Sequence, residues 1–246
     1  DIGILGGLFG LESHSSDYKT IKEKNEFVRQ NKSILIPTIN KEVKFYIDKH
    51  LIFSNDIIDN HKYSNAINYK CIYKDGKILN KLYYSIGGGF IVDHDHLDEE
   101  MDIKAELFDF DSAISLLKFC ALKKLCIYEV VLNNEILLNG NKKEEIKSKI
   151  LNIWKIMNKS IYNGMRESGI LYGGLKIRKR ANALYKKLIK DDKGYDPLDV
   201  MDWVNVFAIA VAEENASFGR IVTAPTNGAA GIIPSVIKYY LEFVNN

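Results

Sequence analysis

A small, polar, turn-forming stretch near the C-terminus has the residue types best suited to bind an anion. It reads Thr-Ala-Pro-Thr-Asn-Gly over residues 223–228 and lies between two apolar runs. Pro225 fixes its own φ and disfavours helical backbone at Ala224, while Asn-Gly readily takes positive φ. We therefore expect the N–H groups of residues 227–231 to point outward at a helix start, where unpaired donors suit a carboxylate or phosphate. An ordinary helix–turn–helix connection is the alternative.

A glycine-rich strand exit, Ser85-Ile86-Gly87-Gly88-Gly89, is the second candidate. Consecutive glycines let the backbone approach another group closely. The G-x-G-x-x-G spacing of a dinucleotide site and its following helix are absent, so this pattern does not predict such a site. A tight strand exit against a neighbouring domain is the structural alternative.

Residues that bind metals are few and poorly spaced. Cys71, Cys120 and Cys126 form no C-x-x-C pair, and we expect buried, small apolar side chains at Cys120 and Cys126. The segment His94-Asp95-His96 would place two imidazoles on one side of an extended chain, which suits a divalent metal. Its acidic neighbours favour a solvated loop instead. The sequence therefore predicts no metal site.

Two charged clusters are less informative. The basic cluster at 178–187 has no interleaved aromatic residues, which favours a solvated helix face over nucleic-acid binding, although Arg178 or Arg180 could pair with a carboxylate at a domain junction. Glu213 and Glu214 are adjacent on a predicted helix and point about 100° apart. We therefore expect at most one of them to face inward, where it could orient the following loop.

Composition indicates a globular protein. With 246 residues, 46% of them hydrophobic, the chain can form one large domain or two small ones. A net charge of +2 gives no reason to expect a nucleic-acid or membrane surface. No apolar run reaches membrane-spanning length, we expect no secretory signal, and the few, oddly spaced cysteines lead us to expect a reducing, intracellular setting. The first residues resemble a packed helix without an initiator Met, so we expect the chain to begin inside a larger protein.

The elements predict an α+β fold. We expect a small mixed α/β domain over 1–110 and a helical domain over 111–246, with the boundary in the acidic stretch 94–111. Strands at 66–73 and 78–86 flank an Asp-Gly hairpin turn. Shorter strands are expected at 34–36, 43–47, 51–53 and 90–92. Helices are expected at 1–12, 18–30, 113–124, 142–168, 178–190 and 198–217, with Asp111 or Ser112, Asn141 and Pro197 among their start signals.

Four stretches carry a family resemblance, and they occur in family order along the chain. They are Tyr83 to Val92 (YYSIGGGFIV), Arg178 to Leu188, Pro197 to Ala208 (PLDVMDWVNVFA), and Glu213 to Tyr240, which contains EENA, GRIVT and APTNG. Together they resemble the bacterial-type, iron–sulfur-dependent L-serine dehydratases, or L-serine ammonia-lyases. The resemblance implies a small α/β domain before a helical catalytic domain, as the change of sequence pattern near residue 110 predicts.

The resemblance also implies an activity and a site. It implies a lyase of amino-acid catabolism and gluconeogenesis that converts L-serine to pyruvate and ammonia with a [4Fe–4S] cluster, as a cytoplasmic homodimer when complete. The residues implied to bind the substrate are Thr223, Thr226, Asn227 and Gly228, with Ser85, Gly87, Gly88 and Gly89 from the other domain. The catalytic base stays unassigned.

The chain also departs from the family pattern. The family's N-terminal serine- and histidine-containing motifs would lie upstream of Asp1, and its cluster-binding cysteines downstream of Asn246. Ala230 stands where many relatives have Cys, a position that we do not take for a ligand. The resemblance thus implies part of a dehydratase without its cluster ligands. An inactive fragment, or a small amino-acid-binding module that lacks the cluster, is the alternative.

Overall fold

The computed structural model describes residues 2–54, 63–97, 108–140, 142–172, 174–190, 198–224 and 226–245. Asn141, Pro197 and Pro225, for which the sequence predicts local roles, lie outside the described residues, as do 98–107 of the expected domain boundary.

The chain begins with two helices that pack on a small hairpin. Helix α1 (Ile2–Leu8) precedes α2 (Tyr18–Asn31), whose N-cap Asp17 accepts a hydrogen bond from the Thr20 N–H at 2.9 Å. Strands β1 (Ser33–Ile36) and β2 (Lys41–Lys44) pair antiparallel across a 3₁₀ turn. The buried hydrophobic cluster between these elements consists of Phe9, Val28 and Ile34.

Two short strand predictions in this region need correction. The strand expected at 43–47 ends at Lys44, and Ile47 begins helix α3 (Ile47–His50). Ile47 packs against the Phe9–Val28–Ile34 cluster, so tertiary contact overrides its β-propensity. Residues 51–53 are irregular because no strand pairs with them among the described residues.

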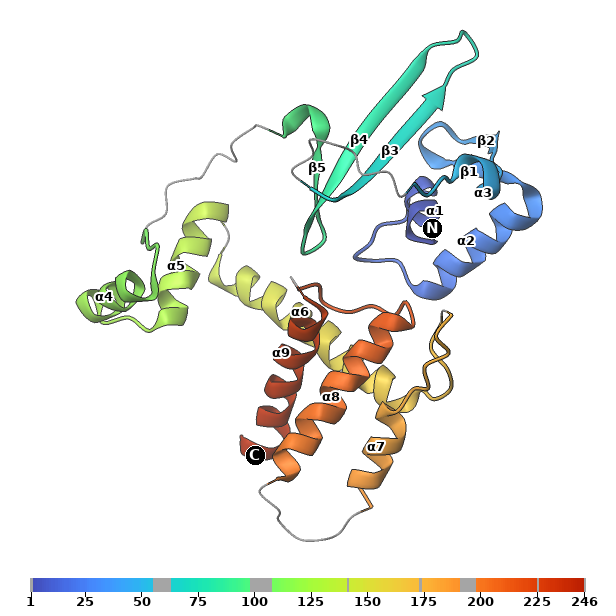
Figure 1. Ribbon diagram of the computed structural model, residues 1–246. Helices are drawn as coiled ribbons and strands as arrows, with labels where there is room; N and C mark the ends of the chain where they lie inside the picture. The colour runs from blue at the N-terminus through green and yellow to red at the C-terminus, as the bar shows by residue number, and fades with distance from the viewer. Residues whose placement is uncertain are drawn as a thin grey trace.

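A three-stranded antiparallel sheet follows: β3 (Asn65–Ile72), β4 (Ile78–Gly87) and β5 (Phe90–Asp93). The Asp-Gly turn joins β3 to β4 as predicted, with Gly76 at a φ of 83°. Ser85 pairs with Ile91, and the register shifts between Ser85 and Gly87. The end of the sheet where β4 turns into β5 points toward the helical part of the chain (Figure 1).

Helices make up the described structure after residue 108: α4 (Ala113–Lys123), α5 (Ile127–Asn139), α6 (Lys143–Arg166), α7 (Ala181–Leu188), α8 (Asp199–Ala216) and α9 (Asn227–Tyr239), which a π turn (Tyr240–Val244) extends. Ser112 caps α4 as predicted. The basic helix is shorter than expected, because Arg178 forms a β-bridge with Ile170 before α7 begins. The N-terminal strands and this run of helices confirm the α+β class, whereas the boundary at 110 stays a prediction.

The core of the helical part forms where α6, α7 and α8 meet. Its buried side chains include Ile161, Val206 and Phe207. Helices α6 and α8 approach so closely at Gly164 that a Cβ there would lie 2.1 Å from the carbonyl oxygen of Ala210. Only glycine permits this contact, so one residue fixes the distance between the two helices.

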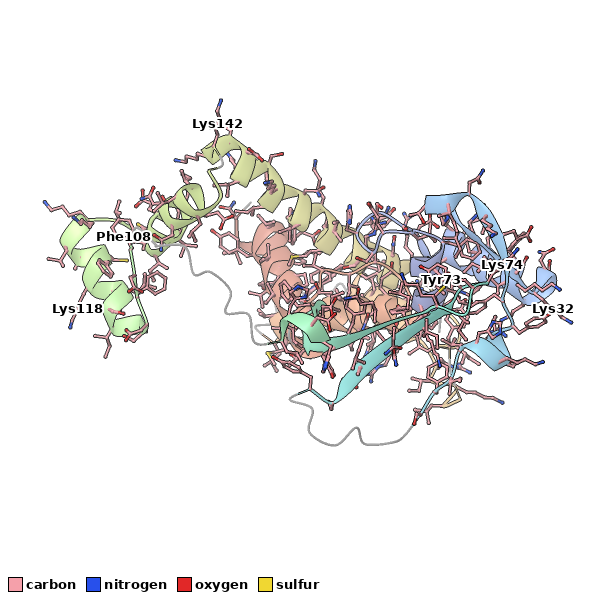
Figure 2. The ribbon with its side chains drawn as sticks, turned by 90° about the horizontal axis from the view of Figure 1, so that it is seen from above. Lys32, Tyr73, Lys74, Phe108, Lys118 and Lys142 are labelled. Carbon is pink, nitrogen blue, oxygen red and sulfur yellow. The ribbon has the colours of Figure 1, made fainter. Side chains whose placement is uncertain are left out.

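Helices α4 and α5 form a hairpin that reaches away from this core (Figures 1 and 2). Phe108 and Lys118 mark it in Figure 2, at the opposite end from Tyr73 and Lys74 of the β3–β4 turn. Asn134 of α5 binds the backbone of Phe108 twice: its Oδ1 accepts from the Phe108 N–H at 2.9 Å and its Nδ2 donates to the Phe108 carbonyl at 2.8 Å. The chain entering α4 is thereby attached to α5.

Candidate functional site

The loop at residues 223–228, which we expected to bind an anion, leads into the N-terminus of α9. Its geometry differs from the predicted one. The helix begins at Asn227, so Asn227 and Gly228 have helical backbone and not positive φ. Thr226 is the N-cap, and its Oγ1 accepts a hydrogen bond from the Ala229 N–H at 3.2 Å. The Ala230 N–H pairs with the Thr226 carbonyl at 3.1 Å. We expected the N–H groups of residues 227–231 to point outward. Those of Asn227 and Gly228 are thus the first-turn donors that remain for a ligand.

The glycine-rich turn of the sheet meets this loop. Gly87, Gly88 and Gly89 all have positive φ, at 96°, 60° and 85°. A Cβ placed on Gly89 would lie 3.7 Å from Cγ2 and 3.9 Å from Oγ1 of Thr223. The β4–β5 turn and the start of α9 lie side by side in Figure 1. Two motifs that are more than a hundred residues apart in the sequence are therefore in contact.

The remaining predicted residues take different positions. Ser85 is exposed and helps to line an apolar hollow of about 170 Å³ on the sheet, together with Tyr84 and Ile91. At Gly87 no atom lies within 4 Å of an added Cβ, and at Gly88 the nearest is in the Phe90 ring. The Asn227 side chain lies outside the described side chains. Gly89 is therefore the member of the glycine-rich turn whose contact with the loop is shown.

The carboxylates at the end of α8 both face inward, so the prediction that at most one does is wrong. Glu213 is 5% exposed and Glu214 is 6% exposed. The Glu213 carboxylate accepts hydrogen bonds from the backbone N–H groups of Arg180 at 2.7 Å and Ala181 at 3.2 Å. It caps α7 from another helix of the same helical part, through the backbone of Arg180, so this contact is not the domain-junction pair expected of Arg178 or Arg180.

Glu214 lies beneath the turn that leads to the candidate site. A Cβ on Gly219 would lie 2.3 Å from its carboxyl carbon, and Asn163 Nδ2 donates a hydrogen bond to its Oε1 at 2.9 Å. Burial raises the pKa of Glu214 above its ordinary value, and the negative charge of Glu167 adds to that rise. The Asn163 hydrogen bond and the charges of Lys179 and Lys159 oppose it. The adjacent carboxylates at the end of an apolar helix were the sequence signal for these roles.

The described residues do not fit a metal or an iron–sulfur cluster. They contain no group of three or more His, Cys, Asp or Glu side chains gathered for metal binding. Cys71 and Cys126 are exposed and Cys120 is half-buried, so the expectation of buried residues at Cys120 and Cys126 is wrong: they occupy α4 and the N-cap of α5, on the outlying hairpin.

The segment 94–96 forms a 3₁₀ turn and not an extended chain. Lys81 Nζ lies 2.6 Å from Asp95 Oδ2 and 3.4 Å from Asp93 Oδ2, so these two carboxylates are paired with a lysine. Among the residues with assigned positions, no helix is long and apolar enough to cross a bilayer.

Family models match both parts of the chain. The model of the serine dehydratase beta chain matches residues 1–96, and that of the serine dehydratase alpha chain matches residues 122–246. The chain belongs to the serine dehydratase family. This confirms the resemblance drawn from the four sequence stretches.

Named relatives agree with this family assignment. The chain is 40% identical to an L-serine dehydratase of Haemophilus influenzae, over all of this chain and 54% of that protein. It is 37% identical to L-serine dehydratase 2 of Escherichia coli, over 99% of this chain and 53% of that protein. An L-serine dehydratase of Streptomyces coelicolor is 34% identical over 98% of this chain and 52% of its own length. The chain thus spans about half the length of the curated relatives it matches.

Each of the two family matches contains one of the two segments that meet at the candidate site of this serine dehydratase family member. The beta-chain match contains the β4–β5 turn, and the alpha-chain match contains the α8–α9 connection. Gly89 and Thr223 therefore join the two matched segments at the place where α9 begins.

Proposed function

We propose that this chain forms part of an L-serine dehydratase and that its own residues bind the carboxylate end of L-serine at the start of α9. The contact between Gly89 and Thr223 supports this proposal, because it brings a side-chain-free turn against a helix N-terminus. The family membership and the names of the relatives supply the substrate.

The proposed binding mode follows from the available donors. The N–H groups of Asn227 and Gly228 and the dipole of α9 attract the serine carboxylate. The exposed Thr223 hydroxyl supplies a further hydrogen bond to the carboxylate or amino group. The Thr226 hydroxyl keeps the helix start in place by capping it, so its role is to position the donors. Gly89 lies beside Thr223, and because it has no side chain it leaves space for the ligand.

We extend the proposal to the complete enzyme only as far as the family resemblance reaches. The complete enzyme then produces pyruvate and ammonia, with a [4Fe–4S] cluster as the Lewis acid. It acts in the cytoplasm as a homodimer, and neither a membrane nor a nucleic acid is its partner. Because the cysteines described above do not fit a cluster, we assign no step to it. Ser85, Gly87 and Gly88 remain proposed contributors to the substrate site.

Titration calorimetry with L-serine tests the proposed site on this chain. Thr223→Val keeps the shape of the side chain and removes its hydroxyl, so we expect roughly tenfold weaker binding. Thr38→Val, at an exposed threonine of the 3₁₀ turn after β1, is the matched control and should bind as the parent does. Equal affinity of all three proteins would contradict the role of Thr223.

A second measurement concerns the cluster. After anaerobic reconstitution with iron and sulfide, we expect no pyruvate from this chain with L-serine. Turnover would show that cluster ligands are present in the chain after all.

A further inference from the structure

One residue in the turn between α8 and α9 has a strained backbone. The neighbouring sequence does not account for this conformation. Phe218 follows the end of α8 with a φ of 62°, a left-handed conformation that bulky residues rarely adopt. Glycine is the usual residue at such a helix end, yet here the glycine comes one position later. At Gly219 an added Cβ would lie 2.3 Å from the Glu214 carboxyl carbon, so the buried Glu214 side chain would have to move. Phe218 differs from a glycine at this position by its ring, so the contacts of that ring are the feature to explain.

The Phe218 ring contacts two aromatic side chains from other segments. It stacks on Tyr18, at the start of α2, with ring centroids 5.4 Å apart and planes inclined by 12°. Tyr172, in the connection between α6 and α7, lies 5.8 Å from Phe218 and 6.0 Å from Tyr18, measured between centroids. The trio thus joins the α8–α9 turn to the N-terminal unit.

Arg220 makes a second connection to the same place. Its Nη2 donates a hydrogen bond to the Ser16 carbonyl at 2.8 Å, across 204 positions of sequence. Ser16 lies two residues before Tyr18, so both contacts end at the N-terminus of α2. The following residue, Ile221, packs against the helical core, and Thr223 then meets Gly89.

We propose that Phe218 and Arg220 are positioning residues, which hold the segment leading to Thr223 against the N-terminal unit and so set the geometry of the candidate site. The backbone of this segment is attached to α8 at one end, because the Gly219 N–H donates to the Glu214 carbonyl at 2.8 Å. The same segment is attached to the start of α2 through the aromatic trio and Arg220. Movement of the N-terminal helices α1 and α2 would therefore displace the segment that leads to Thr223. The consequence for serine rests on the proposed function, whereas the attachment itself does not.

Amide hydrogen exchange on the whole chain tests the attachment. Phe218→Gly removes the ring and also relieves the left-handed strain, so the urea midpoint should stay unchanged or rise. Exchange of the N–H groups of residues 217–219, which donate to carbonyls of α8, should nevertheless become roughly three- to tenfold faster, because the stacking is lost. Tyr18→Leu and Arg220→Gln should accelerate exchange at the same residues. Tyr128→Leu, at an exposed tyrosine of α5, is the control and should leave it unchanged.

The outcomes separate this inference from the proposed function. Exchange at 217–219 that stays at the parent rate, or follows the urea midpoint alone, would overturn the positioning role. L-serine titration into the same variants then gives the consequence for the site: weaker binding by Phe218→Gly and Arg220→Gln is expected. If the parent chain binds no L-serine, the proposed function fails while the exchange result still decides the attachment.

Discussion

Glu213 and Glu214 are adjacent in the sequence, yet each has a separate structural role at the end of α8. Glu213 supplies acceptors to two N–H groups at the start of α7, and Glu214 is buried under Gly219. Burial of two neighbouring carboxylates is tolerated because each receives hydrogen bonds from a different element. Such residues are predictable as polar positions on an apolar helix, but their partners are not.

Replacing Glu213 tests its capping role. Glu213→Ala leaves the Arg180 and Ala181 N–H groups without their acceptor in a buried place, so we expect a loss of roughly 3 kcal/mol in the free energy of unfolding. Urea denaturation measures it. Glu144→Ala, in the first turn of α6, removes an exposed carboxylate and should change stability by less than about 0.5 kcal/mol. A loss equal to that of the control would exclude the cap.

The raised pKa of Glu214 predicts a pH dependence of stability. The folded state binds the Glu214 proton more tightly than the unfolded state does. Its contribution is therefore most favourable below the ordinary pKa of 4.5 and is lost as the pH rises through the raised value. Glu214→Gln stays neutral and keeps an acceptor for Asn163. We expect it to be more stable than the parent near neutral pH and equal to it near pH 4.5, and unfolding at several pH values would contradict this if the difference were constant.

At the scale of elements, close approach decides which helices pack together. Most element predictions were confirmed, including α2, α4, α8 and the β3–β4 hairpin, because they depend on local periodicity and turn residues. Two of the errors fall where a non-local contact overrides local preference, at Arg178, which pairs with Ile170, and at Ile47, which packs on the N-terminal core. The contact between α6 and α8 at Gly164 is of the same kind.

Gly164→Ala tests that contact. The added Cβ would overlap the Ala210 carbonyl, so the helices must separate, and we expect a loss of roughly 3 kcal/mol in the free energy of unfolding. Gly7→Ala in α1 is the control: an added Cβ meets no atom within 4 Å, and the better helix former should raise stability by up to about 1 kcal/mol. Thermal unfolding of both variants distinguishes overlap from helix propensity, and a stabilised Gly164→Ala protein would rule out the close approach.

At the scale of the whole molecule, three contacts join segments that precede residue 96 to the connection between α8 and α9. They are the meeting of Gly89 with Thr223, the Arg220–Ser16 hydrogen bond and the stacking of Tyr18 on Phe218. All three involve residues 218–223, between α8 and α9. The candidate site therefore depends on contacts between the strands that precede residue 96 and the helices that follow residue 108.

The sequence by itself determined the α+β class, most helices, the central hairpin and the family, because these depend on local pattern and on motifs that are contiguous in the chain. It also singled out the Thr223 loop and the glycine-rich turn. Only the tertiary structure decided that Gly89 is the glycine that meets Thr223, that α9 begins at Asn227, and that both glutamates face inward. These facts depend on contacts between residues far apart in the sequence, which local periodicity does not encode.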